Sequence, residues 1–506
     1  MASIDKIAPQ HYQDRAHFKE CCIYQVYPAS FCDSNGDGVG DVQGIISKLD
    51  YLKDLGVVNY HEIDARFGTL ADVDELILEM HRRDMKLVMD LVVNHRSDQH
   101  QWFVESRKSK DNPYRDFFWW KAPKYSPEGE RLPPNNWREE FSTGSAWEWD
   151  ETTQEYYLHL YCKEQPDLNW ENPKLRQAVY DDIMKWWLDR GCDGFRMDVI
   201  NLISKVPSLP DAPIKNPGDK FQEPYKYCAN GPRVHEFLQE MNREVLSMYP
   251  NLITVGETPF THHDFDVLVP YVLPENKELQ TIFQFEQQEV DGYPQLVPKD
   301  YQLSEFKEIT SRWQVEMQKR GGWNSIYLEV KLAVRKSKSG HSNPDVSDIM
   351  DGLQRKARDH ARNPMQWDDS HNAGFSLRGD AKPWMRVHDD YRDWNVAKQI
   401  EDPDSVLSFW KRMLAFRKEH LSCTYGYYTL LSPDDEKVFA YVKEYEDERM
   451  LVLLNFTKEA VTYPLPKEAG DLRNVKDSIC NYNGPLPDMK DEKVELRPYE
   501  ALVIVT

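Results

Sequence analysis

The chain has 506 residues and a formal net charge of −22, which argues against nucleic acid as a partner and gives no attraction to an anionic membrane. The polar N-terminus lacks the pattern of a secretory signal, no apolar run is long enough to span a bilayer, and the eight cysteines show neither metal-type spacing nor a dense disulfide framework. We therefore expect a reduced, cytoplasmic globular protein of about two or three domains, whose oligomeric state the sequence does not indicate.

The first predicted element is a buried strand over 21–31, and a glycine-rich loop over 33–41 follows it. Oxygen ligands stand at odd positions of this loop: Asp33, Asn35, Asp37, Asp41 and the carbonyl of Val39. Hard oxygen ligands on a tightly wrapped loop suit calcium, so we expect a structural calcium site. The alternative is a loop closed by Asx turns without metal.

Helices and strands then alternate along the chain. The pattern predicts helices over 42–55 and 71–83 and a strand over 85–93, with Asp90 and His95 at the carboxyl end of that strand. Helix followed by strand, repeatedly, is typical of an α/β barrel or a doubly wound sheet.

The alternation stops between 96 and 170, where Trp, Tyr, Pro and Asn are abundant. This stretch is too long for an ordinary loop and predicts a lid or an inserted subdomain. A helix over 173–190 then leads to a strand over 191–200, GCDGFRMDVI.

Arg196 and Asp198 stand two residues apart on this strand, so strand alternation places them on one face. An arginine beside a carboxylate keeps that carboxylate ionised, and an ionised carboxylate can act as a nucleophile or stabilise a cation. The alternative is an ion pair at a strand end with no catalytic role.

The rest of the chain continues the α/β pattern and then changes class. The predicted elements are a helix over 233–248, strands over 252–257, 278–290 and 323–329, a loop over 359–368 and a helix over 406–419. From Tyr425 on, alternating apolar residues in KVFAYVKEY, RMLVLLNF and ALVIVT predict an all-β domain, expected to be a sandwich.

Five polar side chains fall at predicted strand ends: Asp90, His95, Arg196, Asp198 and Glu257. In an α/β barrel these ends share one face, which is where chemistry takes place. Two carboxylates in different surroundings suit glycoside hydrolysis, with Asp198 as nucleophile and Glu257, its pKa raised, as acid and then base. Two unrelated acidic strand ends would give the same spacing.

Five motifs together resemble glycoside hydrolase family 13, the α-amylase family. DLVVNH, GFRMDV and TVGE resemble three of its four signature regions, QPDLNW resembles its fifth region, and ARNPMQWD is similar to the α-glucosidase and oligo-1,6-glucosidase branch. The resemblance covers nearly the whole chain. It implies retaining cleavage of the non-reducing-end glucose from α-1,4- or α-1,6-linked gluco-oligosaccharides such as maltose and isomaltose.

The resemblance also implies a fold. A (β/α)8 barrel of the TIM type would cover 1–95 and 171–422, an inserted subdomain after the third strand would cover 96–170, and a C-terminal β-sandwich would cover 423–506.

Roles follow from the resemblance for individual residues. Asp198 and Glu257 would be the nucleophile and the acid/base. His95 and Arg196 would contact the terminal glucose or the nucleophile, and Asp90 would support Arg196 from behind. Val199 resembles the α-1,6 type, where maltases tend to carry threonine. Arg362 of ARNPMQWD would bind substrate.

Two blocks of the family pattern are absent from this sequence. Glu329 is followed by Val330, where the family has Asn-His-Asp, and Val58 by Asn59, where it has a strand and a Gly-Tyr-Asp segment. We therefore expect the second and eighth barrel strands to be missing, and the first strand either to pair with the third and seventh or to remain at an open edge.

The same gaps predict negligible hydrolysis, because the transition-state aspartate and the glucose-holding pair are lost. Two alternatives to an enzyme stay open. One is a catalytically dead amylase-like binding or scaffold protein, and the other is an incomplete gene product.

Overall fold

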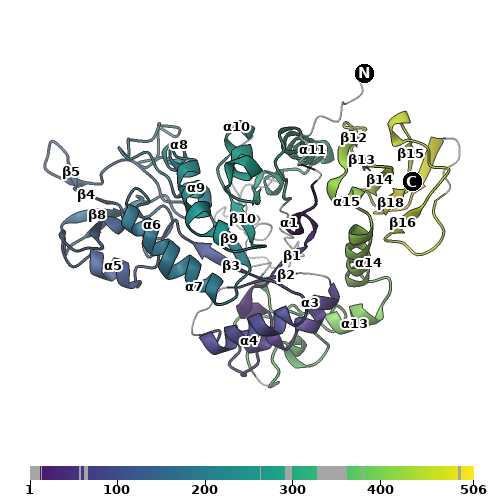
Figure 1. Ribbon diagram of the computed structural model, residues 1–506, viewed down its shortest axis with the longest axis horizontal. Helices are drawn as coiled ribbons and strands as arrows, with labels where there is room; N and C mark the ends of the chain where they lie inside the picture. The colour runs from purple at the N-terminus through teal and green to yellow at the C-terminus, as the bar shows by residue number, and fades with distance from the viewer. Residues whose placement is uncertain are drawn as a thin grey trace, which may run out of the picture. The chain divides into compact units, whose positions relative to one another are not determined.

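The computed structural model describes residues 12, 14–55, 58–61, 66–261, 264–290, 299–326, 362–379, 381–487 and 492–506, and Figure 1 labels most of their helices and strands. The chain divides into two compact units, one formed by Met1–Leu87 with Phe285–Thr506 and the other by Val88–Gln284. No helix in these ranges has the length and the apolar character needed to cross a membrane.

Parallel strands organise the unit Val88–Gln284. In order across the sheet they are β3 (Leu87–Val92), β9 (Gly194–Asp198), β10 (Ile253–Glu257) and β11 (Thr281–Phe283). Phe195 and Met197 of β9 are fully buried, as the apolar residues of a parallel strand covered on both faces should be. The register pairs Arg196 with Asp90 of β3 and with Val255 of β10, so the carboxyl ends of the three strands meet at one edge.

Helices connect these strands. They are α6 (Pro173–Val179), which continues through a π-helical segment (Tyr180–Lys185) into α7 (Trp186–Asp189), then α8 (Tyr225–Cys228), α9 (Val234–Glu244) and α10 (Phe265–Leu268). At the start of α6 the Asn172 side chain accepts the N–H of Lys174, and Pro173 occupies the first helical position. The helix predicted over 173–190 is confirmed.

The aromatic stretch between 96 and 170 forms its own small elements. They are α5 (Gln101–Ser106), a three-stranded antiparallel sheet of β4 (Trp120–Lys121), β8 (Glu155–Leu158) and β7 (Trp147–Asp150), and a hairpin of β5 (Lys124–Tyr125) and β6 (Arg131–Leu132). Trp119, Trp137, Trp147 and Leu158 form a buried cluster, and Val199, which follows β9, belongs to the same cluster. This stretch therefore shares its core with the residue that follows Asp198.

The other unit begins with α1 (His17–Glu20) and β1 (Ile23–Gln25), which pairs in parallel with β2 (Val58–His61). The helix predicted over 42–55 is divided into α2 (Val42–Ile46) and α3 (Leu49–Leu55), and α4 covers Leu70–His81. Asp41 caps α2, and Thr69 and Asp72 form a capping box at the start of α4.

The strand β2 lies in the stretch where the second barrel strand is expected to be missing. That absence is not confirmed, and β1 does not pair directly with the third strand, because Val58–His61 supplies enough backbone to satisfy the three-residue β1. The parallel strands that the structure describes do not close into a barrel. The stretch before 351 in which the eighth strand is expected to be missing, together with Val330, lies outside the described residues.

The strand predicted over 278–290 is much shorter. It is limited to Thr281–Phe283, and a turn at Glu286–Gln288 follows it. The Glu286 carboxylate faces α11 (Leu303–Arg320), where it accepts the indole N–H of Trp313 at 2.6 Å and pairs with Arg312 at 2.7 Å. These bonds turn the chain away from an extended course.

The C-terminal residues form an all-β domain, as predicted. A five-stranded antiparallel sheet has the order β12 (Tyr427–Leu431), β13 (Val438–Tyr445), β14 (Glu448–Asn455), β18 (Ala501–Val505) and β16 (Asp477–Cys480), and β15 (Val461–Pro464) pairs with β17 (Lys493–Leu496). Buried residues of both sheets, including Leu453, Tyr463 and Val494, form one core between them.

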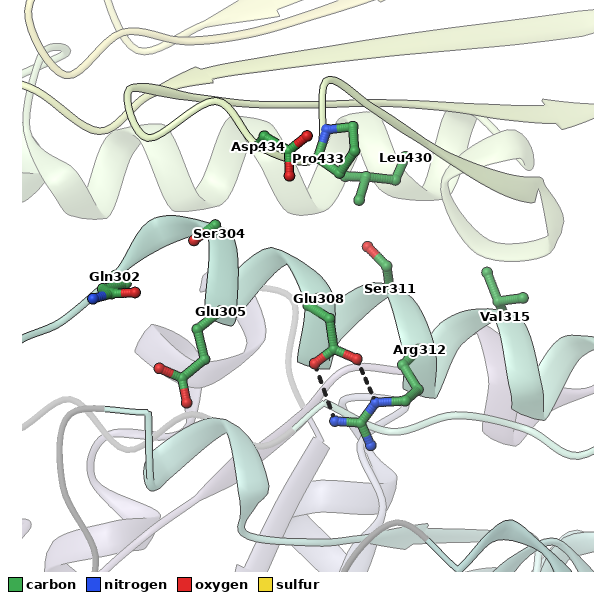
Figure 2. Close-up of a pocket in the computed structure, with 10 residues that line it drawn as sticks. All are labelled: Gln302, Ser304, Glu305, Glu308, Ser311, Arg312, Val315, Leu430, Pro433 and Asp434. Carbon is green, nitrogen blue, oxygen red and sulfur yellow. Dashed lines mark hydrogen bonds and ion pairs between the residues drawn. The ribbon is translucent and has the colours of Figure 1, made fainter.

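Helix α11 packs on this domain through a buried lysine. The Lys307 ammonium donates to the carbonyls of Ser432, Asp435 and Val438 at 2.7, 2.6 and 3.2 Å. Beside this anchor an open groove of about 660 Å³ runs between α11 and the start of the β-domain, with Glu308 paired to Arg312 on its wall (Figure 2).

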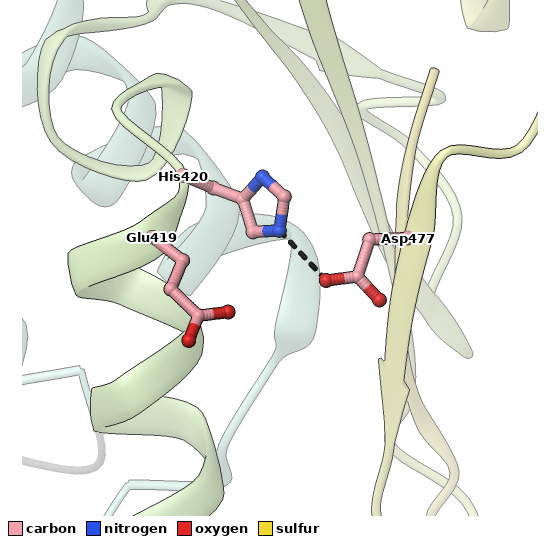
Figure 3. Close-up of side chains that lie close together, drawn as sticks. All are labelled: Glu419, His420 and Asp477. Carbon is pink, nitrogen blue, oxygen red and sulfur yellow. Dashed lines mark hydrogen bonds and ion pairs between the residues drawn. The ribbon is translucent and has the colours of Figure 1, made fainter.

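Helices α13 (Val396–Glu401), α14 (Val406–Glu419) and α15 (Ser422–Tyr425) lead into the same domain. His420, directly after α14, lies between two strands of the sheet. Its Nδ1 is 2.9 Å from Glu448 and its Nε2 is 2.8 Å from Asp477, and Figure 3 shows Glu419 beside this contact. The imidazole therefore ties the end of α14 to β14 and β16.

Candidate active site

Polar side chains gather where the parallel strands of the unit Val88–Gln284 end. They are Asp90, Asn94 and His95 on and after β3, Arg196 and Asp198 on β9, and Glu257 on β10. The parallel register explains this meeting, because residues at matching positions of neighbouring strands leave the sheet at the same edge.

Arg196 is the centre of this group. Its Nη1 lies 2.6 Å from Asp198 and 2.9 Å from Asp90, and its Nη2 lies 2.6 Å from Glu257. Burial opposes the charge on the guanidinium, but the carboxylates of Glu257, Asp90 and Asp198 outweigh burial and raise the pKa of Arg196 further above its high ordinary value. The predicted contacts of Arg196 with Asp198 and Asp90 are confirmed.

The two carboxylates predicted to react contact different nitrogens of one guanidinium. Because those nitrogens are about 2.3 Å apart, the contacting oxygens of Asp198 and Glu257 are at most about 7.5 Å apart. This limit excludes separations above about 9 Å, which would contradict a retaining mechanism, and it includes the spacing of about 5–5.5 Å typical of retaining enzymes.

Glu257 is almost fully buried, with a side chain that is 9% exposed. Burial raises its pKa, Arg196 lowers it and Asp198 raises it again, with the result that the pKa of Glu257 is about 7. One oxygen also accepts the backbone N–H of Val199 at 3.1 Å. A carboxyl group with this pKa can donate a proton and later remove one near neutral pH.

Val199 has a left-handed backbone, with φ of 37° and ψ of 44°. This conformation is rare for a β-branched residue and costs on the order of 1–3 kcal/mol. The chain turns sharply after Asp198 at this residue, whose backbone N–H donates to the Glu257 carboxyl group. The sequence motif carries no sign of this backbone conformation.

His95 is buried, and burial lowers its pKa, so the ring favours the neutral form. Its ring centroid lies 5.3 Å from that of Tyr161, and its Nε2 is 3.1 Å from the amide nitrogen of Gln165. A β-bridge between His95 and Asp167 brings QPDLNW to the end of β3.

The roles predicted from the motifs include neither Lys205 nor Asp167, although Asp167 lies within QPDLNW. Lys205 and Asp167 form an ion pair of 2.9 Å, and both side chains are fully buried. A lysine that follows the apolar run after Asp198 is the one signal in the sequence that could have indicated such a pair.

The side chains of the loop 33–41 close the loop. Asp33, Asn35 and Asp37 each accept the N–H of the residue two positions on, at 3.1, 2.8 and 2.8 Å, and Asp41 caps α2. These are the Asx turns of the metal-free alternative. Carboxylate and amide oxygens keep further lone pairs beyond these bonds, so the donor set also fits calcium.

Arg362 belongs to the other unit, and its own contacts place it beside the end of β1. Its guanidinium carbon lies 4.9 Å from the ring centroid of Tyr27, and its carbonyl accepts the hydroxyl of Ser30 at 2.5 Å. Trp384 contacts the same Tyr27 ring at 6.1 Å. The sequence prediction did not include this aromatic pair.

Comparisons with known proteins agree on one family. The chain matches "Alpha amylase, catalytic domain" over 25–58, 57–335 and 331–426, and "Maltogenic Amylase, C-terminal domain" over 428–503. It is 42% identical to an oligo-1,6-glucosidase of Parageobacillus thermoglucosidasius, with 97% of this chain and 99% of the relative covered. It is 40% identical to an alpha-glucosidase of Schizosaccharomyces pombe, with 99% and 100% covered.

The fold has close counterparts among solved structures. The trehalose-6-phosphate hydrolase of Bacillus licheniformis superposes with a TM-score of 0.85 at 35% identity, over 97% of this chain and 100% of that one. An isomaltulose synthase mutant from Erwinia rhapontici NX5, in complex with sucrose, has the same TM-score at 31% identity, over 97% and 99% of the two chains.

The catalytic-domain match is interrupted twice. Its three segments overlap at 57–58 and at 331–335, close to the two places where family blocks are expected to be missing. The alignment with the oligo-1,6-glucosidase has 573 positions, more than the 506 residues of this chain, so gaps are opened in the chain to align it.

Proposed function

Because this chain belongs to the α-amylase family of glycoside hydrolases, we propose that it is an α-glucosidase that removes the non-reducing-end glucose of α-1,4- and α-1,6-linked gluco-oligosaccharides. The observation that carries the proposal is the shared guanidinium of Arg196. It holds Asp198 and Glu257 close to each other, while burial, partly offset by Arg196, raises the pKa of Glu257 to about 7.

The proposed reaction is a retaining double displacement. Asp198 attacks the anomeric carbon, and the bond from that carbon to the leaving oxygen breaks as Glu257 protonates the oxygen. A covalent glucosyl-Asp198 ester results. Glu257, now ionised, removes a proton from water, and the hydroxide oxygen replaces Asp198 at the same carbon, so glucose leaves with its α-configuration retained.

The remaining residues have supporting roles in this proposal. His95 and Arg196 face the terminal glucose or the nucleophile, Asp90 holds Arg196, and Arg362 contributes to substrate binding. Val199 and the relatives named oligo-1,6-glucosidase support a preference for the α-1,6 linkage.

The expectation of an inactive chain is not supported by the relatives, which align over nearly their whole length with nearly all of this chain. Hydrolysis is therefore the function to test. A binding or scaffold role would return as the explanation only if the purified protein bound glucose without cleaving any glucoside.

Calcium at the loop 33–41 is part of the proposal. Asp33, Asn35, Asp37, Asp41 and the carbonyl of Val39 would hold it, and the ion would cross-link the loop that precedes α2. A cytoplasmic location is also proposed, supported by eight cysteines that are all unpaired. The proposed domains remain a barrel over 1–95 and 171–422, an insertion over 96–170 and a sandwich over 423–506.

The test measures hydrolysis of isomaltose, maltose and nitrophenyl α-glucoside by the purified full chain. We expect glucose release that Asp198→Asn abolishes while the protein remains folded, since removing the nucleophile leaves no covalent route. A wild-type rate no higher than that of Asp198→Asn would contradict the proposal.

A further inference from the structure

A buried ion pair lies directly behind His95. The Lys205 ammonium contacts the Asp167 carboxylate at 2.9 Å, and it donates to the side-chain oxygen of Asn94 at 3.0 Å and to the carbonyl of Leu202 at 2.9 Å. Three acceptors thus use the three N–H donors of the ammonium. The other oxygen of Asp167 accepts the N–H of Leu160 at 2.7 Å, so the pair is well satisfied.

This pair fixes which way the Asn94 amide faces. Its oxygen faces Lys205, which can only donate, and its nitrogen lies 3.2 Å from the Asp167 carboxylate, which can only accept. Turning the amide over would put two donors together and two acceptors together among fully buried side chains. The two charges therefore decide an orientation that is otherwise assigned only from the hydrogen-bond network.

The same amide nitrogen contacts the ring of His95, with 3.3 Å between Asn94 Nδ2 and His95 Nδ1. An amide nitrogen carries two hydrogens, so one is donated to Asp167 and the other to His95. A ring nitrogen that accepts a hydrogen bond holds a lone pair, and the proton of a neutral ring must then be on Nε2.

We infer that Lys205, acting through Asp167 and Asn94, is a positioning residue that holds His95 as the neutral tautomer protonated on Nε2. This nitrogen then offers a hydrogen-bond donor to a sugar hydroxyl. The role toward the sugar rests on the proposed function, whereas the tautomer does not.

One further contact follows from this assignment. The Nε2 of His95 lies 3.1 Å from the amide nitrogen of Gln165, and two donors cannot share a hydrogen bond. Gln165 must therefore turn its amide oxygen toward His95 when no sugar is bound. The cost is small, because the bond given up is the 3.3 Å contact with the N–H of Cys162.

The test is nitrogen NMR of the full chain with ¹⁵N-labelled histidine rings. The His95 signals are identified by their loss in His95→Gln. The chemical shift of each ring nitrogen distinguishes a protonated nitrogen from a bare one, and we expect a protonated Nε2 and a bare Nδ1 near neutral pH.

Two variants test the origin of the tautomer. Lys205→Met removes the charge at similar volume. Asn94→Ala removes the donor to Nδ1 together with the amide bonds to Lys205 and Asp167, but it keeps both charges of the ion pair, so it serves as the second variant if Lys205→Met fails to fold. In both variants we expect Nδ1 to be protonated in part of the molecules. We also expect a threefold to tenfold weaker affinity for glucose, which corresponds to the loss of one hydrogen bond of about 1 kcal/mol. Gln165→Leu is the matched control, and it should leave the tautomer unchanged.

A wild-type ring protonated on Nδ1 would overturn the inference, as would a tautomer that neither variant changes or one that Gln165→Leu reverses. A wild type with a protonated Nε2 that hydrolyses no glucoside would contradict the proposed function alone and still support the positioning role.

Discussion

Opposing effects of burial and of neighbouring charges set the pKa of Glu257. Burial raises its pKa, Arg196 lowers it and Asp198 raises it, so that the pKa of Glu257 is about 7. A group that must first give and then take a proton needs such a balance, and a carboxylate paired with arginine alone would remain ionised.

The raised pKa of Glu257 also predicts a pH-dependent cost in stability. A folded-state value of about 7 against an ordinary 4.5 means that the protonated form stabilises the fold, and this contribution is lost as pH rises from about 4.5 through about 7. We expect Glu257→Gln, which cannot ionise, to be more stable than the wild type by on the order of 1–3 kcal/mol at about pH 8 and nearly equal to it at about pH 4.5.

Urea unfolding at the two pH values measures this difference. Glu495→Gln, on an exposed position of β17, is the matched control and should show no pH-dependent difference from the wild type. If Glu257→Gln were less stable than the wild type at both pH values, the ion pair of Glu257 with Arg196 would stabilise the fold by more than burial of the Glu257 carboxylate destabilises it.

Val199→Thr tests linkage preference at the residue after the nucleophile. Threonine has nearly the shape of valine and is also β-branched, so we expect the left-handed backbone to stay while a hydroxyl replaces one methyl group. We expect the ratio of kcat/KM for isomaltose to that for maltose to fall about tenfold, within the range of a single pocket contact. Equal changes for both substrates, at an unchanged melting temperature, would remove Val199 as a determinant of linkage.

At the scale of elements, the loop 33–41 and helix α2 are joined by Asp41, whose side chain accepts the N–H of Gly44 at 2.7 Å. A metal bound in the loop would therefore stabilise the start of the helix as well. Calcium binding should therefore stabilise α2, whereas a loop closed only by its own Asx turns would show no such effect of calcium.

Calcium should raise the melting temperature of the chelator-treated wild type, and Asp37→Ala should lose this gain, because one ligand is removed while the cap from Asp41 remains. Thr69→Ala, which breaks the capping box of α4, is the control: it should cost about 1 kcal/mol with or without calcium. An unchanged wild-type melting temperature on adding calcium would favour the metal-free loop.

The sequence predicted much of the site because strand periodicity has a physical meaning. Residues two apart on a strand share a face, so the contact of Arg196 with Asp198 followed from the sequence, and the tip position of Glu257 followed from the end of its apolar run. The left-handed backbone of Val199 did not follow, since tertiary packing imposes it against local preference. The burial of Lys205 did not follow either, because a charge enters a core only when a distant partner, here Asp167, accompanies it.

The predicted strand lengths were less accurate than the site. Apolar and aromatic residues run over 21–31, but β1 covers only Ile23–Gln25. Its extent depends on its partner, and β2 supplies a short ladder. Periodicity indicates which residues favour a strand, whereas pairing decides how many of them form one.

At the scale of the whole molecule, Lys307 of α11 joins this helix to the C-terminal domain. Its buried ammonium donates to three carbonyls, and Lys307→Met would leave these acceptors without that donor. We expect a loss of about 2–4 kcal/mol in the free energy of unfolding, measured by urea denaturation.

Lys299→Met is the matched control for this change. Lys299 precedes the same helix and pairs at 2.6 Å with Glu305, but its side chain is 49% exposed, so its removal should cost less than about 1 kcal/mol. Equal losses for the two variants would show that burial of the Lys307 ammonium has no special effect.

The packing of Val199 in the aromatic cluster of the 96–170 stretch has a consequence for how such enzymes diversify. The side chain proposed to select the linkage belongs to one buried cluster with Trp137, Trp147 and Leu158, which lie far from it in sequence. Recombination that exchanged this stretch between relatives would therefore also exchange the surroundings of Val199. A chimaera with a foreign insertion should inherit part of the donor's selectivity without any substitution at position 199, and engineering that varies this position alone would sample only part of the available specificity.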